Sequence, residues 1–164
     1  MKVFLAIKKR RSIRKYRKGV LKDKDIYKII EAGSWAPSGL NNQPWRFKII
    51  KDKSTKEKLS DFTKYKRIIR ESSVVICVFL DKQASYHREK DIMAIGACIQ
   101  NMLLCAYELG IGSCWLGEIL KRKSRVTKYL KIHPRYELMA VVSLGYPLKK
   151  PPKGRRKNIK NLIL

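Results

Sequence analysis

Acidic residues are scarce in this sequence: 13 Asp and Glu stand against 39 Lys and Arg, which gives a formal net charge of +26. Such an excess favours anionic ligands and salt-dependent contacts with polyanions. The lysines are spread along the whole chain, and no recognisable nucleic-acid-binding module accompanies them. A basic nucleic-acid-binding protein therefore stays an alternative, and otherwise we expect only non-specific binding of nucleic acid.

Long apolar runs are missing as well. No apolar run reaches the roughly 18 residues that a membrane-spanning helix needs, and the apolar part of the N-terminal stretch MKVFLAIKKRRS is too short for a signal peptide. We therefore expect a cytoplasmic protein without a membrane partner. The chain has 164 residues, 45% of them hydrophobic, which is typical of a single globular domain over residues 1–164.

Histidines and acidic pairs suited to catalysis are also few. His87 and His133 are the only histidines, and neither belongs to an HExxH motif. No GxSxG motif occurs, and Glu108 and Glu118 are too far apart in sequence to support hydrolysis by paired carboxylates. If the protein is an enzyme, a cofactor is expected to supply the chemistry.

The cysteine and glycine patterns exclude two further kinds of site. The four cysteines form no CxxC pair, which favours buried free thiols over a zinc site: Cys77, Cys98, Cys105 and Cys114. The glycines of GIGSCWLG follow a predicted helix rather than a strand, which argues against a Rossmann-type dinucleotide site. Gly110 is better explained as the end of that helix.

Periodicity predicts alternating helices and strands. Helices are expected over 2–10, 23–36, 55–70 and 91–112, and a lysine-rich one to about Leu130, with Asp23 as an N-cap. Strands are expected over 45–52, 73–81 and 136–147, and the second, SVVICVFLD, is apolar enough to be covered on both faces. The stretch PSGLNNQPW reads as a loop.

One helix carries a prediction about assembly. Between residues 92 and 109 it is apolar nearly all round, with only Gln100 and Asn101 polar in its middle. A chain of this size has little room to surround such a helix, which indicates a dimer. The apolar tail NIKNLIL also needs a cover, and the other subunit is the candidate.

The densest cationic motif is RRSIRKY, residues 10–16. In an extended segment Arg10, Ser12 and Arg14 face one side, and two guanidinium groups with a hydroxyl suit one phosphate. A second set, Lys153 and Arg155, lies in PPKGRRK. For each set alone, a solvated basic surface is the competing interpretation.

Four motifs taken in order resemble the FMN-dependent nitroreductase family in its short single-domain form. RRSIRKY resembles RRSxRxF/Y, and APSGLNNQPW resembles PSxxNxQPW. QNMLLCAYELGIGSCWLG resembles QNxxLxAxxxGxGxxWxG, and GYPLKKPPKGRRK resembles GYPxxxPxxKxR. The similarity covers nearly the whole chain, and four motifs in register are a strong signal.

The resemblance implies a set of FMN-binding residues. These are Arg10, Arg11, Ser12 and Arg14 at the phosphate and ribityl chain, Lys153 and Arg155 at the phosphate, Pro37, Ser38, Gly39 and Asn41 from the partner subunit along the isoalloxazine, and Trp115, Leu116 and Gly117 along the flavin. The Gly117 backbone N–H is expected near flavin N5, and no side chain or metal is expected to carry the catalysis.

The same resemblance implies an α+β fold with a central, mostly antiparallel sheet flanked by helices. It implies an intertwined homodimer with FMN at the interface and an arm of about 157–164 reaching to the partner. The implied reaction is ping-pong hydride transfer from NAD(P)H through FMN to a small-molecule acceptor. Nitroaromatics, quinones, enones and halogenated phenols stay open as acceptors, because the connection KQASYHREK is short and leaves the pocket open or covered by Tyr86. A flavin carrier or sensor without substantial turnover is a further alternative.

Overall fold

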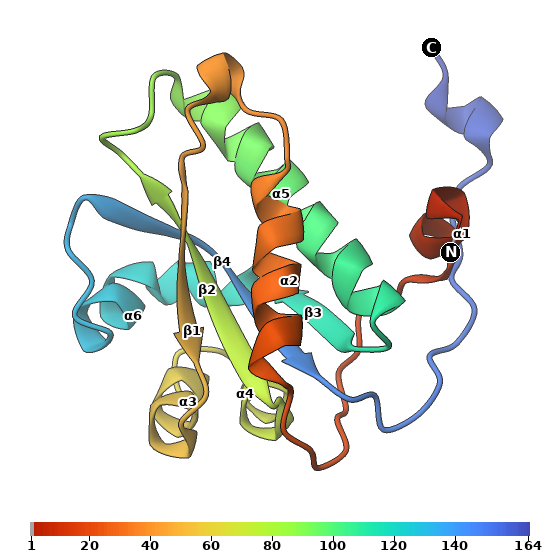
Figure 1. Ribbon diagram of the computed structural model, residues 1–164, viewed down its shortest axis with the longest axis horizontal. Coiled ribbons are helices and arrows are strands. Elements are labelled where there is room, and N and C mark those ends of the chain that lie inside the picture. Colours follow the sequence, from red (N-terminus) through yellow and green to blue (C-terminus); the bar gives the residue numbers. More distant parts are fainter. Residues whose placement is uncertain (1) are drawn as a thin grey trace.

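A four-stranded antiparallel sheet lies between two groups of helices in the computed structural model, which describes residues 2–164 (Figure 1). The strands are β1 (Trp45–Ile50), β2 (Val74–Asp81), β3 (Gly112–Leu116) and β4 (Tyr136–Gly145), in the order β1-β2-β4-β3. This arrangement confirms the predicted α+β fold. Strand β3 was not among the predicted strands. It pairs with β4 from Gly112 opposite Gly145 to Leu116 opposite Val141.

Outside residues 53–71, the helices fall close to their predicted places. They are α1 (Val3–Lys9), α2 (Asp23–Ser34), α3 (Lys53–Ser60), α4 (Lys66–Glu71), α5 (Arg88–Glu108) and α6 (Lys123–Tyr129), with 3-10 turns η1 (Gly39–Asn41), η2 (Glu118–Arg122) and η3 (Ile159–Leu162). The prediction that Asp23 caps α2 is wrong: Lys22 is the N-cap residue, and Asp23 begins the helix. The Asp23 carboxylate instead accepts a hydrogen bond from Lys51 Nζ at 2.6 Å.

The core is divided between the two faces of the sheet. Every residue of β2 is buried. Ile76 and Val78 pack on the face covered by α2 and α5, whereas Cys77 and Phe79 pack on the face covered by α3, α4 and α6. Successive side chains of a strand point to opposite faces, so a strand covered on both sides is apolar throughout. The continuous apolar run in the sequence is thereby explained.

The predicted helix over 55–70 is wrong, because the chain forms two short helices there. The break spans residues 61–65 between α3 and α4. Glu118 explains it: Oε2 of its carboxylate accepts hydrogen bonds from the Thr63 hydroxyl at 2.7 Å and from the Lys64 N–H at 3.1 Å. A tertiary contact from η2 thus holds these residues in a turn that their local sequence does not predict.

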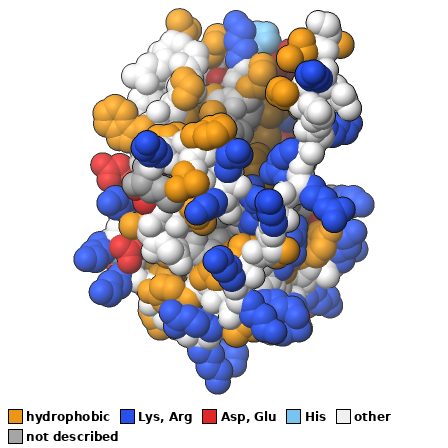
Figure 2. Space-filling model, turned by 90° about the vertical axis from the view of Figure 1, so that its right-hand side faces the viewer, with side chains coloured by type: hydrophobic (Ala, Val, Ile, Leu, Met, Phe, Trp, Pro, Cys, Tyr) orange, Lys and Arg blue, Asp and Glu red, His pale blue; other side chains and the backbone are white. Residues whose placement is uncertain are grey.

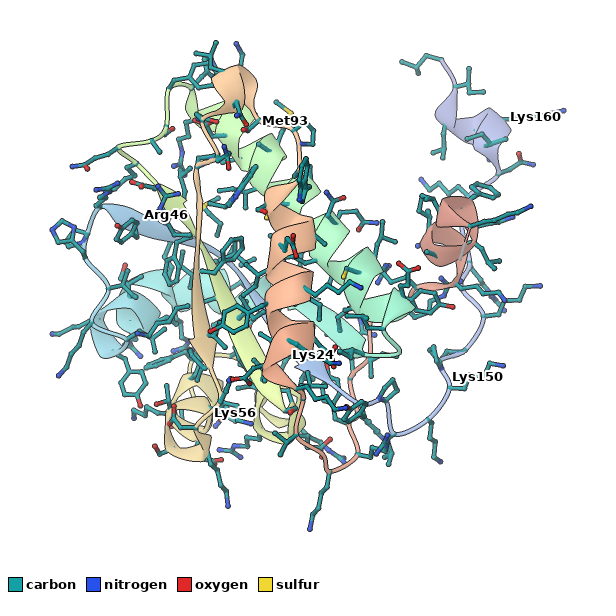
Figure 3. All side chains as sticks on the ribbon, viewed as in Figure 1. Lys24, Arg46, Lys56, Met93, Lys150 and Lys160 are labelled. Atoms are coloured by element: carbon teal, nitrogen blue, oxygen red, sulfur yellow. The ribbon has the colours of Figure 1, made fainter. Side chains whose placement is uncertain are left out.

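Helix α5 buries one face in this chain and leaves another open. Ile95, Ile99 and Met102 are buried, while Met93 is 67% exposed and points outward near the start of the helix (Figure 3). Gly110 follows the helix end with φ of +72°, as predicted for its C-terminal stop. Within residues 2–164 no helix is both long and apolar enough to cross a membrane.

The cysteines are free thiols, as expected. Cys77, Cys98 and Cys114 are buried, and Cys105 is partly exposed. Burial raises the pKa of Cys77 and of Cys98 to about 12. Such thiols stay protonated near neutral pH, so they act as small core side chains.

The two ends of the chain lie side by side, away from the sheet. Helix α1 and the segment after β4 run next to each other at the edge of the molecule (Figure 1). Lys150 and Lys160 project from that C-terminal segment (Figure 3). Ile159 is 67% exposed and Ile163 is 70% exposed, so the apolar tail is uncovered in this chain.

Candidate functional site

The segment RRSIRKY is extended and runs along the outer edge of β3. The Ile13 N–H donates a hydrogen bond to the Ser113 carbonyl oxygen at 2.9 Å, and Ser12 forms a parallel bridge with Ser113. Ile13 and Tyr16 point into the core. Arg14, Ser12 and Arg10 all act to lower the pKa of the Cys114 thiol, so the three residues lie near it. Their shared role at one phosphate stays a prediction, because Arg10 and Arg14 line different pockets.

A cavity of about 1210 Å³ opens between this end of the N-terminal segment and the C-terminal segment. Its cationic lining residues are Lys8, Lys9, Arg10, Arg11, Lys150, Lys153 and Arg156. Gln100 and Tyr107 of α5 complete its polar lining. No acidic residue lines it within the described part of the chain. Lys and Arg side chains cover much of this face of the molecule (Figure 2).

Arg10 and Arg11 are held closely at the cavity, which no acidic residue lines within residues 2–164. Burial, followed by the neighbouring Arg11 and Arg156 cations, lowers the pKa of Arg10. The Arg11 guanidinium lies against Gly154, where a Cβ would sit 2.3 Å from Arg11 Nη2. Arg11 Nη1 donates to the carbonyl oxygens of Lys8 at 2.7 Å and Arg10 at 2.6 Å. Its Nε is buried without a hydrogen-bond partner among residues 2–164. The arrangement favours binding of a multivalent anion.

A smaller pocket of about 250 Å³, called the β3 pocket below, adjoins the same segment. It is lined by Arg14, Tyr65, Ile68, Cys114, Trp115, Leu116, Gly117 and Glu118. Burial raises the pKa of the Cys114 thiol, and Arg14, Ser12 and Arg10 oppose that rise. Cys114 lines this small pocket, and its pKa responds to Arg10, which lines the cationic cavity. A Cβ on Gly117 would meet nothing within 4 Å, so its backbone is open to a flat group.

The third predicted group lies elsewhere in the chain. Pro37, Ser38, Gly39 and Asn41 lie between α2 and β1, and Gly39 touches Tyr86, just before α5 begins. The cationic cavity instead meets α5 at Gln100 and Tyr107, toward its other end. A single chain therefore does not bring this group to the other predicted residues.

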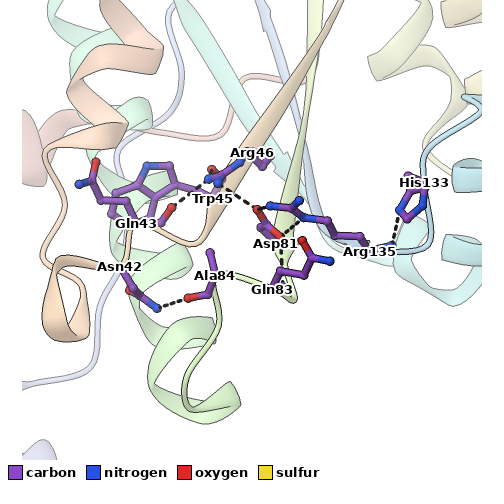
Figure 4. Close-up of polar contacts among 9 residues, drawn as sticks. All are labelled: Asn42, Gln43, Trp45, Arg46, Asp81, Gln83, Ala84, His133 and Arg135. Atoms are coloured by element: carbon purple, nitrogen blue, oxygen red, sulfur yellow. Dashed lines mark hydrogen bonds and ion pairs between the residues drawn. The ribbon is translucent and has the colours of Figure 1, made fainter.

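The cationic residues that line the cavity differ in part from those predicted to bind the phosphate. Lys153 lines the cavity as expected, but Arg156 lines it rather than Arg155. Sequence reasoning also missed Lys8, Tyr65 and Glu118. The run KKRRS signals Lys8, whereas Tyr65 and Glu118 come together only through the turn at 61–65. Both histidines are exposed, and His133 Nδ1 accepts a hydrogen bond from the Arg135 N–H (Figure 4).

Comparison with known proteins decides the family. The family model described as "Nitroreductase family" matches residues 7–65 and 62–146. The chain belongs to the nitroreductase family. This confirms the resemblance inferred from the four motifs.

Individual relatives agree with the nitroreductase assignment. A protein of Archaeoglobus fulgidus, named as a candidate NADH dehydrogenase/NAD(P)H nitroreductase, is 37% identical over 84% of this chain and 81% of its own. The iodotyrosine deiodinase of Thermotoga neapolitana is 27% identical over 93% of this chain and 92% of its own. The crystal structure of a candidate nitroreductase from Desulfovibrio desulfuricans in complex with FMN is 42% identical. It covers 100% of this chain and 96% of its own, with a TM-score of 0.96.

Proposed function

We propose that this nitroreductase-family chain is an FMN-dependent oxidoreductase that uses NAD(P)H to reduce a small electrophile. The observation that carries the proposal is a cationic cavity with no acidic lining residue among residues 2–164, together with a second pocket that holds Arg14 and the open backbone of Gly117. The FMN in the Desulfovibrio structure and the NAD(P)H in the name of the Archaeoglobus protein support the same conclusion. Bound FMN would take a hydride from the reduced nicotinamide and, after the nicotinamide leaves, deliver it to the acceptor.

The residues of the cavity fit a phosphate monoester. Within residues 2–164 the buried Arg11 Nε has no hydrogen-bond partner, and Gly154 leaves the space that the Arg11 guanidinium occupies. In this proposal Arg10, Arg11, Lys153 and Arg156 hold the phosphate, with Ser12 and Arg14 beside the ribityl chain. Guanidinium groups form paired, charge-assisted hydrogen bonds to phosphate oxygens, so they both bind and orient the group.

The β3 pocket fits the ring end of the same ligand. Trp115, Leu116 and Gly117 would lie along the ring, and the Gly117 N–H would donate toward N5. Arg14 belongs to this pocket as well. A fixed cation beside a ring that gains negative charge on reduction favours the reduced state. The chain's own contribution is thus to bind, orient and stabilise charge, rather than to supply a catalytic side chain.

The proposed site is completed by a second copy of the chain. Pro37, Ser38, Gly39 and Asn41 lie apart from the cationic residues of their own chain, so we infer that they line the flavin bound by the other copy. The arm of about 157–164 would cover apolar surface of the partner. Its exposed Ile159 and Ile163 and the open face of α5 at Met93 support this homodimer.

The acceptor is proposed only as a class. The names of the relatives include a nitroreductase and an iodotyrosine deiodinase. A small, electron-poor and mostly planar molecule is common to these activities, and a nitroaromatic, a quinone, an enone or a halogenated phenol would each qualify.

Titration with FMN tests the phosphate site directly. We expect Arg11→Ala to weaken FMN binding on the order of 10- to 100-fold, which is the effect of losing hydrogen bonds to a charged group. Riboflavin, which lacks the phosphate, should bind both proteins alike. Arg125→Ala, on the exposed surface of α6, is the matched control and should bind FMN as the unaltered protein does. Equal FMN affinity in all three proteins would refute the phosphate site.

A further inference from the structure

Asp91 is a fully buried carboxylate to which the proposed reaction gives no role. Its Oδ1 accepts a hydrogen bond from Asn42 Nδ2 at 2.7 Å. Its Oδ2 accepts from the Ser85 hydroxyl at 2.6 Å, from the Tyr86 N–H at 3.1 Å and from the His87 N–H at 3.2 Å. One carboxylate therefore joins the first turn of α5, the connection before it and the loop that precedes β1.

The surroundings of Asp91 favour its charged form. Burial by itself would raise the pKa of this carboxyl, but the hydrogen bonds from Ser85, Asn42, His87 and Tyr86 together outweigh burial and lower it. A buried carboxylate with its acceptor sites this well filled is a rigid anchor. The groups bonded to it are consequently fixed relative to one another.

The loop held by this anchor has an unusual backbone. Leu40, Asn41 and Gln43 have φ of +55°, +53° and +44°, a region disfavoured for residues with side chains. Asn42 lies among them, and its Nδ2 also donates to the Ala84 carbonyl oxygen at 3.0 Å (Figure 4). The Ser38 hydroxyl accepts from the Gln43 N–H at 3.1 Å. Strained conformations persist only where the surroundings determine them, and Asn42 and Ser38 supply those contacts.

Gly39 and Tyr86 make a second contact between the same two segments. A Cβ on Gly39 would lie 1.9 Å from the Tyr86 hydroxyl oxygen and 2.6 Å from its ring carbon Cζ. The ring thus occupies the space that any side chain at position 39 would need. Gly39 is not among the residues with positive φ, so its backbone can accept alanine and only the ring opposes it.

We propose that Asp91 is a positioning residue: with Asn42 and the Gly39–Tyr86 contact it forms a lock that fixes loop 38–43 in its strained shape before the loop meets the flavin. The inference rests on the proposed function, in which Ser38, Gly39 and Asn41 line the FMN of the other subunit. A loop fixed in advance loses little conformational freedom on binding. Asp91 therefore affects the affinity for FMN without itself touching the flavin.

Amide hydrogen exchange tests the lock independently of flavin. In Asp91→Asn and in Asn42→Ala we expect the amides of residues 40–43 and 86–87 to exchange about tenfold faster or more, as follows from losing a hydrogen bond to a charged group. Asp52→Asn, which alters the exposed N-cap of α3, is the control and should leave these amides unchanged. Unchanged exchange in both lock variants would overturn the proposal. Faster exchange in a protein that binds no FMN would keep the lock and refute the proposed function alone.

A double-mutant cycle tests the Gly39–Tyr86 contact. Gly39→Ala should push the Tyr86 ring away and weaken FMN binding several-fold, and Tyr86→Ala should have a similar effect. In the Tyr86→Ala protein the same Gly39→Ala change should have a clearly smaller effect, because the obstructing ring is gone and only its contact with the flavin is left. Effects that simply add would show that alanine at position 39 acts on the flavin directly, and would overturn the proposed contact.

Discussion

The backbone N–H of Ile13 donates a hydrogen bond to the carbonyl oxygen of Ser113 at 2.9 Å. This bond fixes the register of the cationic N-terminal segment against β3. Arg10, Ser12 and Arg14 consequently lie near enough to Cys114 to affect its pKa. In the proposed function, this segment brings the anion cavity and the β3 pocket to one flavin.

Arg155 and Arg156 are adjacent, but only Arg156 lines the cavity, so comparing them separates a specific anion site from a general basic surface. Arg156 lines the cavity and lowers the pKa of Arg10, whereas the exposed Arg155 does not line it. We predict that Arg156→Ala weakens FMN binding about tenfold, while Arg155→Ala changes it less than twofold. Titration of both variants at one ionic strength checks this. A larger effect from Arg155 would restore the assignment made from the sequence.

The sequence predicted the elements whose signals are local. Three signals can be read from residues close together in the sequence. They are the uninterrupted apolar run of β2, the long apolar stretch of α5 and the alternation in RRSIRKY. The split between α3 and α4 could not be predicted, because Glu118 lies about 55 positions along the chain from Thr63. Strand β3 was missed because it has five residues and is defined by its partners in β4 and the N-terminal segment.

The same limit applies to the candidate site: features set by nearby residues could be predicted, and features set by the tertiary fold could not. The grouping of Arg10, Ser12 and Arg14 follows from the rule that residues two apart in an extended segment face the same side, and their shared role at a phosphate stays a prediction. The choice between Arg155 and Arg156 depends on the path of an irregular segment, and its sequence has no helical or strand periodicity that predicts which side chain faces the cavity. The Asp91 anchor was also missed, since it joins a loop, a connection and a helix that only the tertiary fold brings together.

Glu118 is predicted to hold the turn that carries Tyr65 into the β3 pocket. Glu118→Ala removes the acceptor of the Thr63 hydroxyl and the Lys64 N–H, so Tyr65 should lose its fixed place and KM for the acceptor should rise roughly three- to tenfold. Glu118→Gln keeps a carbonyl oxygen that can accept both bonds and should behave nearly as the unaltered protein. If glutamine were as damaging as alanine, the charge rather than the turn would be responsible.

Glu137 is predicted to make stability depend on acid pH. Arg88 and Lys123 hold its carboxylate, and Oε2 lies 2.7 Å from Arg88 Nη1. The Arg88 hydrogen bond, opposed by burial and assisted by Lys123, lowers the pKa of Glu137 to about 2. Its folded pKa is below its unfolded value, so the stabilisation is complete above about pH 4.5 and is lost as pH falls toward 2.

Urea unfolding at pH 6 and at pH 3 measures that loss. Because Arg88 and Lys123 are about half exposed, we expect Glu137→Gln to remove only about 1–2 kcal/mol of the pH-dependent stability. Glu89→Gln, a similar change at an exposed position, is the control. Parallel pH profiles for the unaltered protein and Glu137→Gln would contradict the assignment.

The apolar arm is predicted to stabilise a dimer. Removal of residues 158–164 takes away the exposed Ile159, Leu162, Ile163 and Leu164, so the dimer should dissociate at higher protein concentration than the full chain. Light scattering over a dilution series measures this. Because the proposed flavin site needs both copies, FMN should be lost at the same concentrations. A shortened protein with the mass and dilution behaviour of the full chain would remove the arm from the interface.

The visible absorption spectrum of the purified protein, before and after anaerobic addition of NADPH or NADH, tests the central claim most directly. We predict an oxidised-flavin spectrum after reconstitution with FMN, and bleaching within seconds to minutes of adding one of the two nicotinamides. Reoxidation by a nitroaromatic or a quinone should restore the spectrum. A protein that takes up no FMN, or one whose flavin neither nicotinamide bleaches, would contradict the assignment as an FMN-dependent NAD(P)H oxidoreductase.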